Sequence, residues 1–172
     1  MGSCCYTMGD TVGKGYQMNS QAEIALSNYM EELDQFLGLC DEFDSSGKWN
    51  VRKNGYMSAF FKTDLFSVVL EAMSADGVFE NSEAEVINRM FSSEYTNSEL
   101  RDMYNSLSSV ITDYCDGEAE DAVRMLSDID PIAADQYRHL ILSAVDVVSK
   151  ADGVAEGSEQ ELIAKLEKAL QA

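Results

Sequence analysis

Apolar residues recur at intervals of three and four along most of this 172-residue chain, and this spacing restricts its fold to helices. One stripe, between positions 20 and 43, contains Leu26, Tyr29, Met30, Leu33, Phe36, Leu37, Cys40 and Phe43. Such a spacing places apolar side chains on one face of a helix. Proline occurs once, at Pro131, and clusters of β-branched residues are scarce. The sequence therefore predicts an all-α fold.

The same spacing predicts seven helices packed as a single globular bundle. Their expected ranges are 20–43, 56–74, 82–93, 96–114, 118–127, 131–151 and 158–172. Residues 1–18 lack apolar periodicity and are expected to form a flexible arm, so the single domain covers residues 19–172. The segment that ends at Gly55 is predicted to be a polar connection, with Trp49 packed back on the core. The helix at 96–114 is predicted to bury Leu100, Met103, Tyr104, Leu107, Val110, Ile111 and Tyr114.

An internal duplication is the most informative motif. Residues 75–86 match residues 151–162 without a gap, and eight of the twelve positions are identical. Each segment begins with Ala-Asp-Gly-Val, follows a long apolar helix and precedes a shorter amphipathic one. This pattern predicts two copies of a helix–loop–helix unit, related by an approximate two-fold.

Several positions of the repeat have structural interpretations. A glycine after the last helical turn suits a left-handed backbone, and the valine that follows is expected to tuck under the loop. A Ser-x-x-Glu capping box is expected to open the next helix. In the two copies these residues are Gly77, Val78, Ser82 and Glu85, and Gly153, Val154, Ser158 and Glu161.

Three further carboxylates in each copy are candidate metal ligands. They are Asp76, Glu80 and Glu83 in the first copy, and Asp152, Glu156 and Glu159 in the second. Three carboxylates around a tight turn can present several oxygens to calcium or magnesium. A regular calcium-binding loop is excluded, because its first ligand positions would fall on Ala72 and Val148. Alternatively, the acidic residues only bond loop amides and stabilise helix N-termini.

An apolar helix that ends in Ala-Asp-Gly, followed by an acidic loop and a short helix, resembles the TerB-like family. The resemblance covers about residues 55–172, with the signature in 65–91 and 140–170. It implies a compact helical fold and cation binding by acidic loops. It also implies a role in stress response, such as tellurite resistance, or in membrane-linked complexes, and no established catalytic activity.

Charge restricts the possible partners. The chain has 31 acidic residues against 12 Lys plus Arg, a formal net charge of −19. Nucleic acids and anionic membrane surfaces are disfavoured, because both are bound through basic groups. Divalent cations and basic proteins or peptides are the expected partners, although the acidity can also serve solubility alone. No run of about 18 apolar residues predicts a membrane span, and no secretory signal is present. We expect a cytoplasmic protein.

Enzyme signatures are scarce. The single histidine, His139, adjoins an apolar stripe and is expected at its rim. Neither a phosphate-binding glycine loop nor a Gly-x-Ser-x-Gly motif occurs, and Cys40 and Cys115 are expected to be buried thiols. A non-enzymatic interaction module is therefore favoured. The alternatives are a carboxylate-based, metal-dependent enzyme and a purely structural acidic scaffold without metal.

Overall fold

The computed structural model describes residues 20–75, 77–151 and 157–170. Within these ranges the chain forms eight α-helices and one π-helical segment, and no strand. The elements are α1 (Ser20–Ser46), α2 (Val51–Asn54), α3 (Met57–Ser74), α4 (Asn81–Phe91), α5 (Asn97–Asp113), η1 (Tyr114–Glu118), α6 (Ala119–Ile129), α7 (Pro131–Ser149) and α8 (Gly157–Leu170). The all-α prediction is confirmed. The arm predicted at residues 1–18 lies outside the described residues.

The seven helices predicted from apolar spacing correspond to α1 and α3–α8, and the structure adds two short elements. Helix α2 lies in the predicted polar connection, where the Asn50 side chain accepts a hydrogen bond from the Lys53 backbone N–H (3.2 Å). Trp49 is buried as predicted, and its Nε1 donates to the Gly55 carbonyl (2.8 Å). The segment η1 joins α5 directly to α6, where the sequence predicts two separate helices.

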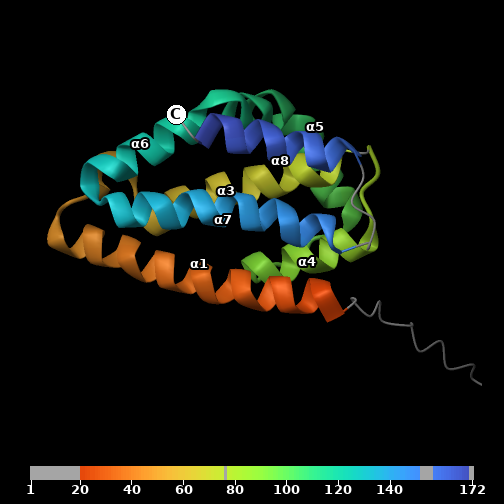
Figure 1. Ribbon diagram of the computed structural model, residues 1–172, viewed down its shortest axis with the longest axis horizontal. Coiled ribbons are helices and arrows are strands. Elements are labelled where there is room, and N and C mark those ends of the chain that lie inside the picture. Colours follow the sequence, from red (N-terminus) through yellow and green to blue (C-terminus); the bar gives the residue numbers. More distant parts are fainter. Residues whose placement is uncertain (1–19, 76, 152–156, 171–172) are drawn as a thin grey trace, which may run out of the picture.

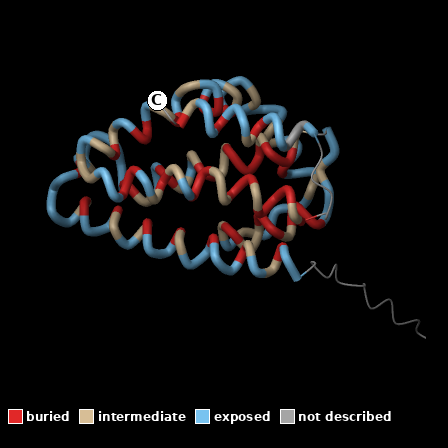
Figure 2. The backbone as a smooth tube through the Cα atoms, viewed as in Figure 1, coloured by how far each residue is buried: buried red, intermediate tan, exposed pale blue. Residues whose placement is uncertain are grey.

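Helices α3 and α7 lie side by side at the centre of the bundle, and α1 runs along α7 (Figure 1). Buried residues gather on the facing sides of these three helices (Figure 2). One aromatic ring from each helix, Phe36, Phe61 and Tyr137, meets the other two with centroids between 4.7 and 5.6 Å apart. Aromatic pairs in such geometry add stability beyond their buried area.

Side chains cap two of the helix starts. The Thr96 hydroxyl accepts from the Glu99 backbone N–H (3.3 Å), and Glu99 accepts in return from the Thr96 N–H (2.8 Å). Asp130 caps α7, with Pro131 in the first turn, and its carboxylate accepts from the Ile132 N–H (2.9 Å). Both caps are local, since each joins residues at most three positions apart.

Helix α5 departs from the predicted burial. Leu107 is 48% exposed and Val110 is 60% exposed, although both belong to the predicted apolar stripe. Leu100 and Ile111 are the residues of α5 that the bundle buries fully. The stripe has the helical period, but α5 lies at the edge of the bundle (Figure 1), so its outer apolar positions remain uncovered.

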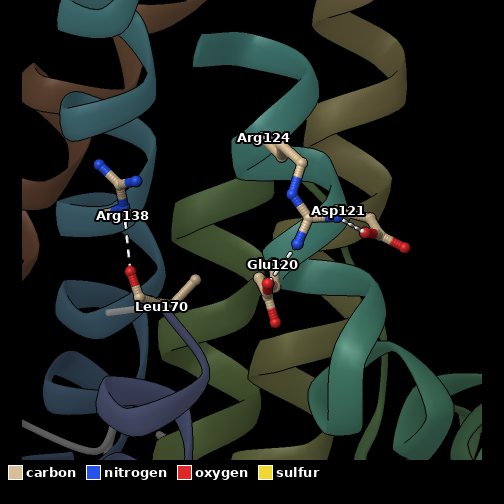
Figure 3. Close-up of polar contacts among 5 residues, drawn as sticks. All are labelled: Glu120, Asp121, Arg124, Arg138 and Leu170. Carbon is tan, nitrogen blue, oxygen red and sulfur yellow. Dashed lines mark hydrogen bonds and ion pairs between the residues drawn. The ribbon is translucent and has the colours of Figure 1, made fainter. Parts of the chain in front are cut away.

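A hydrogen bond from α7 holds the carboxyl end of α8. The Arg138 Nε donates to the Leu170 carbonyl (3.1 Å), and Figure 3 shows this contact beside Arg124 of α6. Arg124 itself pairs with Glu120 and Asp121, one turn earlier on its own helix. A cation at a helix carboxyl terminus satisfies carbonyls that lack an intrahelical partner.

Cys40 and Cys115 are buried free thiols, as predicted. Burial raises the pKa of each thiol to about 12. In the described ranges, no helix is long and apolar enough to cross a membrane.

Candidate functional site

The two acidic loops join helices that meet at one end of the bundle. Helices α3 and α7 end there, and α4 and α8 begin there (Figure 1). Helix α4 begins at Asn81 and α8 at Gly157, positions that correspond in the aligned repeat. The described part of α8 thus includes the position equivalent to the first residue of α4. The two-fold relation of the copies stays a prediction, because residues 152–156 lie outside the described chain.

In the first loop, Gly77 has the predicted left-handed backbone, with φ of 79°. The predicted burial of Val78 is wrong, because this side chain is 52% exposed. Phe79 packs inward instead, against Tyr104 of α5, with ring centroids 6.0 Å apart. The larger aromatic side chain removes more apolar surface from water than valine would. Val154, the equivalent of Val78, lies outside the described residues.

The cap of α4 also differs from the prediction. The helix begins at Asn81, so Glu80 is the N-cap and the capping box pairs Glu80 with Glu83. Glu83 Oε2 accepts a hydrogen bond from the Glu80 backbone N–H (2.9 Å), and Glu83 is buried. The predicted box of Ser82 and Glu85 is therefore displaced by two residues. Both pairs have the i, i+3 spacing, and sequence spacing alone does not decide between them.

Asn97, at the start of α5, ties the first loop to the bundle. Its Nδ2 donates to the Phe79 carbonyl (3.1 Å) and to Asn81 Oδ1 (2.8 Å). This residue was not predicted, because no local sequence pattern connects it with a loop that ends sixteen positions earlier. The contact holds the start of α4 against α5.

The predicted metal ligands are only partly described. Glu80 is exposed, and Glu83 is buried within the cap. Asp76, Asp152 and Glu156 lie outside the described residues, as does the side chain of Glu159. Among the side chains that are described, no three of His, Cys, Asp or Glu are grouped closely enough to hold a metal ion. Cation binding by the complete loops stays a prediction.

Ser149, the last residue of α7, adds an oxygen at the same end. It is buried, and its Oγ has no hydrogen-bond partner among the described residues. A buried hydroxyl without a partner is costly, so native structures usually satisfy it with protein, water or a bound ion. The second acidic loop begins three residues later.

Residues 62–172 match the model of the family described as Tellurite resistance protein TerB. The match spans more than half of the chain and includes both copies of the repeat. The chain belongs to the TerB family. Comparisons with curated proteins and with solved structures gave no significant match.

The TerB match begins within α3, so α1 and α2 lie outside the matched residues. Helix α1 nevertheless packs along α7 and against α3, and it buries Leu26, Tyr29, Leu33, Phe36, Cys40 and Phe43. Helix α1 also makes a polar contact with α7, in which Glu32 Oε2 lies 2.8 Å from His139 Nδ1. His139 is exposed at the rim, as predicted.

A buried polar cluster, which no sequence pattern predicted, lies within the region matched to TerB. The hydroxyls of Tyr114 and Tyr137 are 2.7 Å apart in the core. Burial, followed by the nearby Glu118 carboxylate, raises the pKa of Asp64 to about 7. Asp64 Oδ2 is buried without a partner among the described residues, and its charge raises the pKa of both tyrosines further. Nothing local marks Asp64, because it is a single acid within an apolar stripe.

Asp64 does not belong to the predicted cation site. It precedes the end of α3 by ten residues, about 15 Å along the helix axis. Its chemistry is that of an acid that holds a proton near neutral pH in a nonpolar setting. The loops and the buried cluster are therefore separate features.

Proposed function

We propose that this TerB-family chain is a non-enzymatic module that binds calcium or magnesium at the acidic end of its bundle. The observation that carries the proposal is that α3 and α7 end, and α4 and α8 begin, at the same end. The proposed ligands are Asp76, Glu80, Glu83, Asp152, Glu156 and Glu159. The description of the family makes a stress response the proposed setting.

The donor chemistry at this end fits a hard cation. Glu80 is an exposed carboxylate, and the cap holds the Glu83 carboxylate in position through Oε2. Ser149 contributes a buried hydroxyl close in sequence to the second loop. Calcium and magnesium both take oxygen ligands, and a fixed carboxylate loses less entropy on binding than a mobile one.

A scaffold without metal is the main alternative, since the cap explains Glu83 by itself. The two hypotheses differ in how the fold responds to divalent ions. A specific site stabilises the folded state by mass action, about 2.7 kcal/mol at a hundredfold excess over Kd. A chain with a net charge of −19 is also stabilised by any salt, because added ions screen its repulsion.

The test is thermal unfolding in calcium or magnesium chloride against sodium chloride at matched ionic strength. The fluorescence of buried Trp49 can report unfolding of the bundle. The α1–α3 connection that contains Trp49 lies at the end of the bundle opposite the acidic loops (Figure 1), so the signal does not come from the cation site itself. We expect a larger midpoint shift with the divalent ions, and Asp76→Asn should remove most of the excess. Asp152→Asn should remove less, because Gly157 and Ala155 replace Asn81 and Phe79, and a glycine loses more conformational freedom when a site is ordered.

Asp102→Asn, on exposed α5, is the matched control with the same change in charge. It should leave the excess shift unchanged. Equal shifts in sodium and divalent salts for the wild type and all three variants would contradict the cation site and leave the loops as helix caps.

A further inference from the structure

A groove follows the seam between α1 and α7. Two depressions, of about 440 and 350 Å³, lie along this seam, and Glu32 and His139 line both of them. The helices are antiparallel (Figure 1). The groove therefore runs from Gln21 and Lys150 at one end to Gln35 and Ile132 at the other, with the Glu32–His139 contact between.

Apolar side chains lie at both ends of this groove. Ile24 is 63% exposed in the larger depression, and Ile132 is 70% exposed in the smaller one. Between them, buried Val147 and Leu140 contribute to the lining. A single exposed isoleucine is ordinary on a protein surface, but two along one groove with an apolar lining offer two anchor points.

The charge of the groove is negative. Its lining contains three carboxylates, Glu32, Asp135 and Asp146, against one lysine, Lys150. Lys150 pairs with Asp146 (2.6 Å), and Asp135 pairs with Arg138 on α7. The third carboxylate, Glu32, contacts His139 and is the acid that both depressions share. A donor-rich cation such as a guanidinium complements the partly exposed Glu32 carboxylate.

We propose that the α1–α7 groove is the docking site for a basic amphipathic helix of a partner protein. Gln35 of α1 lines the same depression as Ile132 of α7, so it marks the position of that isoleucine along the groove. Ile24 and Gln35 are eleven residues apart on α1, which is about 16 Å along the helix axis. The bound helix therefore presents apolar residues about eleven positions apart. An arginine or lysine between them faces Glu32. Since α1 lies outside the residues matched to TerB, the groove combines a helix within the matched region with one outside it.

The probe is a fluorescein-labelled synthetic helical peptide of about 18 residues, ~27 Å long. It has leucines eleven positions apart, an arginine between them, and alanine and glutamine elsewhere. A second peptide has glutamate in place of the arginine. Binding is measured by fluorescence anisotropy at about 0.15 M salt, where attraction between distant charges is largely screened. EDTA is present throughout, so the result does not depend on the proposed cation site.

We expect the arginine peptide to bind and the glutamate peptide to bind at least about tenfold more weakly. Ile24→Ser combined with Ile132→Ser should weaken binding of the arginine peptide about tenfold or more, through lost apolar contact. Glu32→Gln should weaken it several-fold. Two controls lie outside the groove, Glu94→Gln for charge and Leu107→Ser for exposed apolar area, and both should bind within about twofold of wild type.

The proposal is overturned if the arginine peptide fails to bind the wild type. It is also overturned if Glu94→Gln weakens binding as much as Glu32→Gln, since that is nonspecific attraction to an acidic surface. Melting of each variant excludes loss of folding as a cause, and both isoleucines are exposed enough for serine to be tolerated.

Discussion

Helices α3 and α7 precede equivalent loops, yet the two copies of the repeat bury different side chains. Aligned at the repeat, Phe61 of α3 corresponds to Tyr137 of α7, and Asp64 corresponds to Leu140. The aligned loops share most of their residues, whereas the aligned helices differ in where they have polar and apolar residues. Asp64 and Tyr137 are nonetheless close enough for the carboxylate charge to raise the pKa of the tyrosine. The differences between the copies therefore create one polar cluster at their interface.

The helices that follow the loops are also held differently. Arg89 on α4 makes two hydrogen bonds to Glu23 on α1, of 2.7 and 2.9 Å. Asn97 adds contacts to the first residue of α4 and to the loop before it. Helix α8 is held by Lys165 with Asp116 of η1 and by Arg138 with the Leu170 carbonyl. The first copy is thus fastened at its loop, and the described contacts of the second lie along the helix.

Replacing Asp64 should have the largest effect of the changes that test this comparison. In the folded protein the pKa of Asp64 is about 7, against 3.8 as the ordinary value. The folded state therefore holds this proton more tightly, and the stability it contributes is present below pH 4 and lost as pH rises through 7. Relative to wild type, Asp64→Asn should gain about 3 kcal/mol of stability between pH 5 and pH 8, because most of the loss in wild type falls in this window. Urea unfolding at both pH values measures the difference.

Asp102→Asn, at an exposed position on α5, is the control for the general loss of negative charge. Its stability relative to wild type should be nearly independent of pH. If the stability difference between Asp64→Asn and wild type is equally independent of pH, the fold does not raise the pKa of Asp64. The carboxylate is then ionised in the folded core at both pH values.

The second test makes α7 resemble α3. Tyr137→Phe installs the residue that α3 has at the equivalent position, and it leaves the Tyr114 hydroxyl buried without its 2.7 Å partner. We expect a loss of about 1–3 kcal/mol, the typical cost of an unsatisfied buried group. Tyr114→Phe combined with Tyr137→Phe should cost less than the two single changes added together. Strict additivity in this double-mutant cycle would show that the hydroxyls do not interact.

The bundle itself was predictable because burial leaves a periodic pattern in the sequence. Leu26, Phe36 and Phe43 are buried at the predicted spacing on α1, and each predicted helix has a counterpart. The pattern failed for Leu107 and Val110, because period identifies an apolar face but not whether another helix covers it. Covering depends on where α5 lies in the bundle, which no local sequence feature specifies.

The candidate sites were predictable only where they are local. Gly77 and the acidic residues around it lie within one short segment, so their pattern is visible in sequence. The Glu80–Glu83 cap required knowledge of the first helical residue, which sequence patterns locate poorly. Asp64 with Tyr137, and Glu32 with His139, combine residues of separate helices. Such juxtapositions follow from packing and leave no signal along the chain.

The smallest expected effect concerns the caps, and it compares the two copies directly. Glu83→Ala removes the acceptor of the Glu80 N–H and should cost about 1 kcal/mol, the usual value of a helix cap. Glu83→Gln keeps an acceptor and should cost only a few tenths of that. Glu159→Ala, the equivalent change, should cost less than Glu83→Ala, because Gly157 stands where the first copy has Asn81 and lacks the side chain that Asn97 binds. Urea unfolding in EDTA isolates the cap from any bound cation. Equal costs for the two alanine variants would show that the loops are capped alike, and that the first copy gains nothing from its tie to α5.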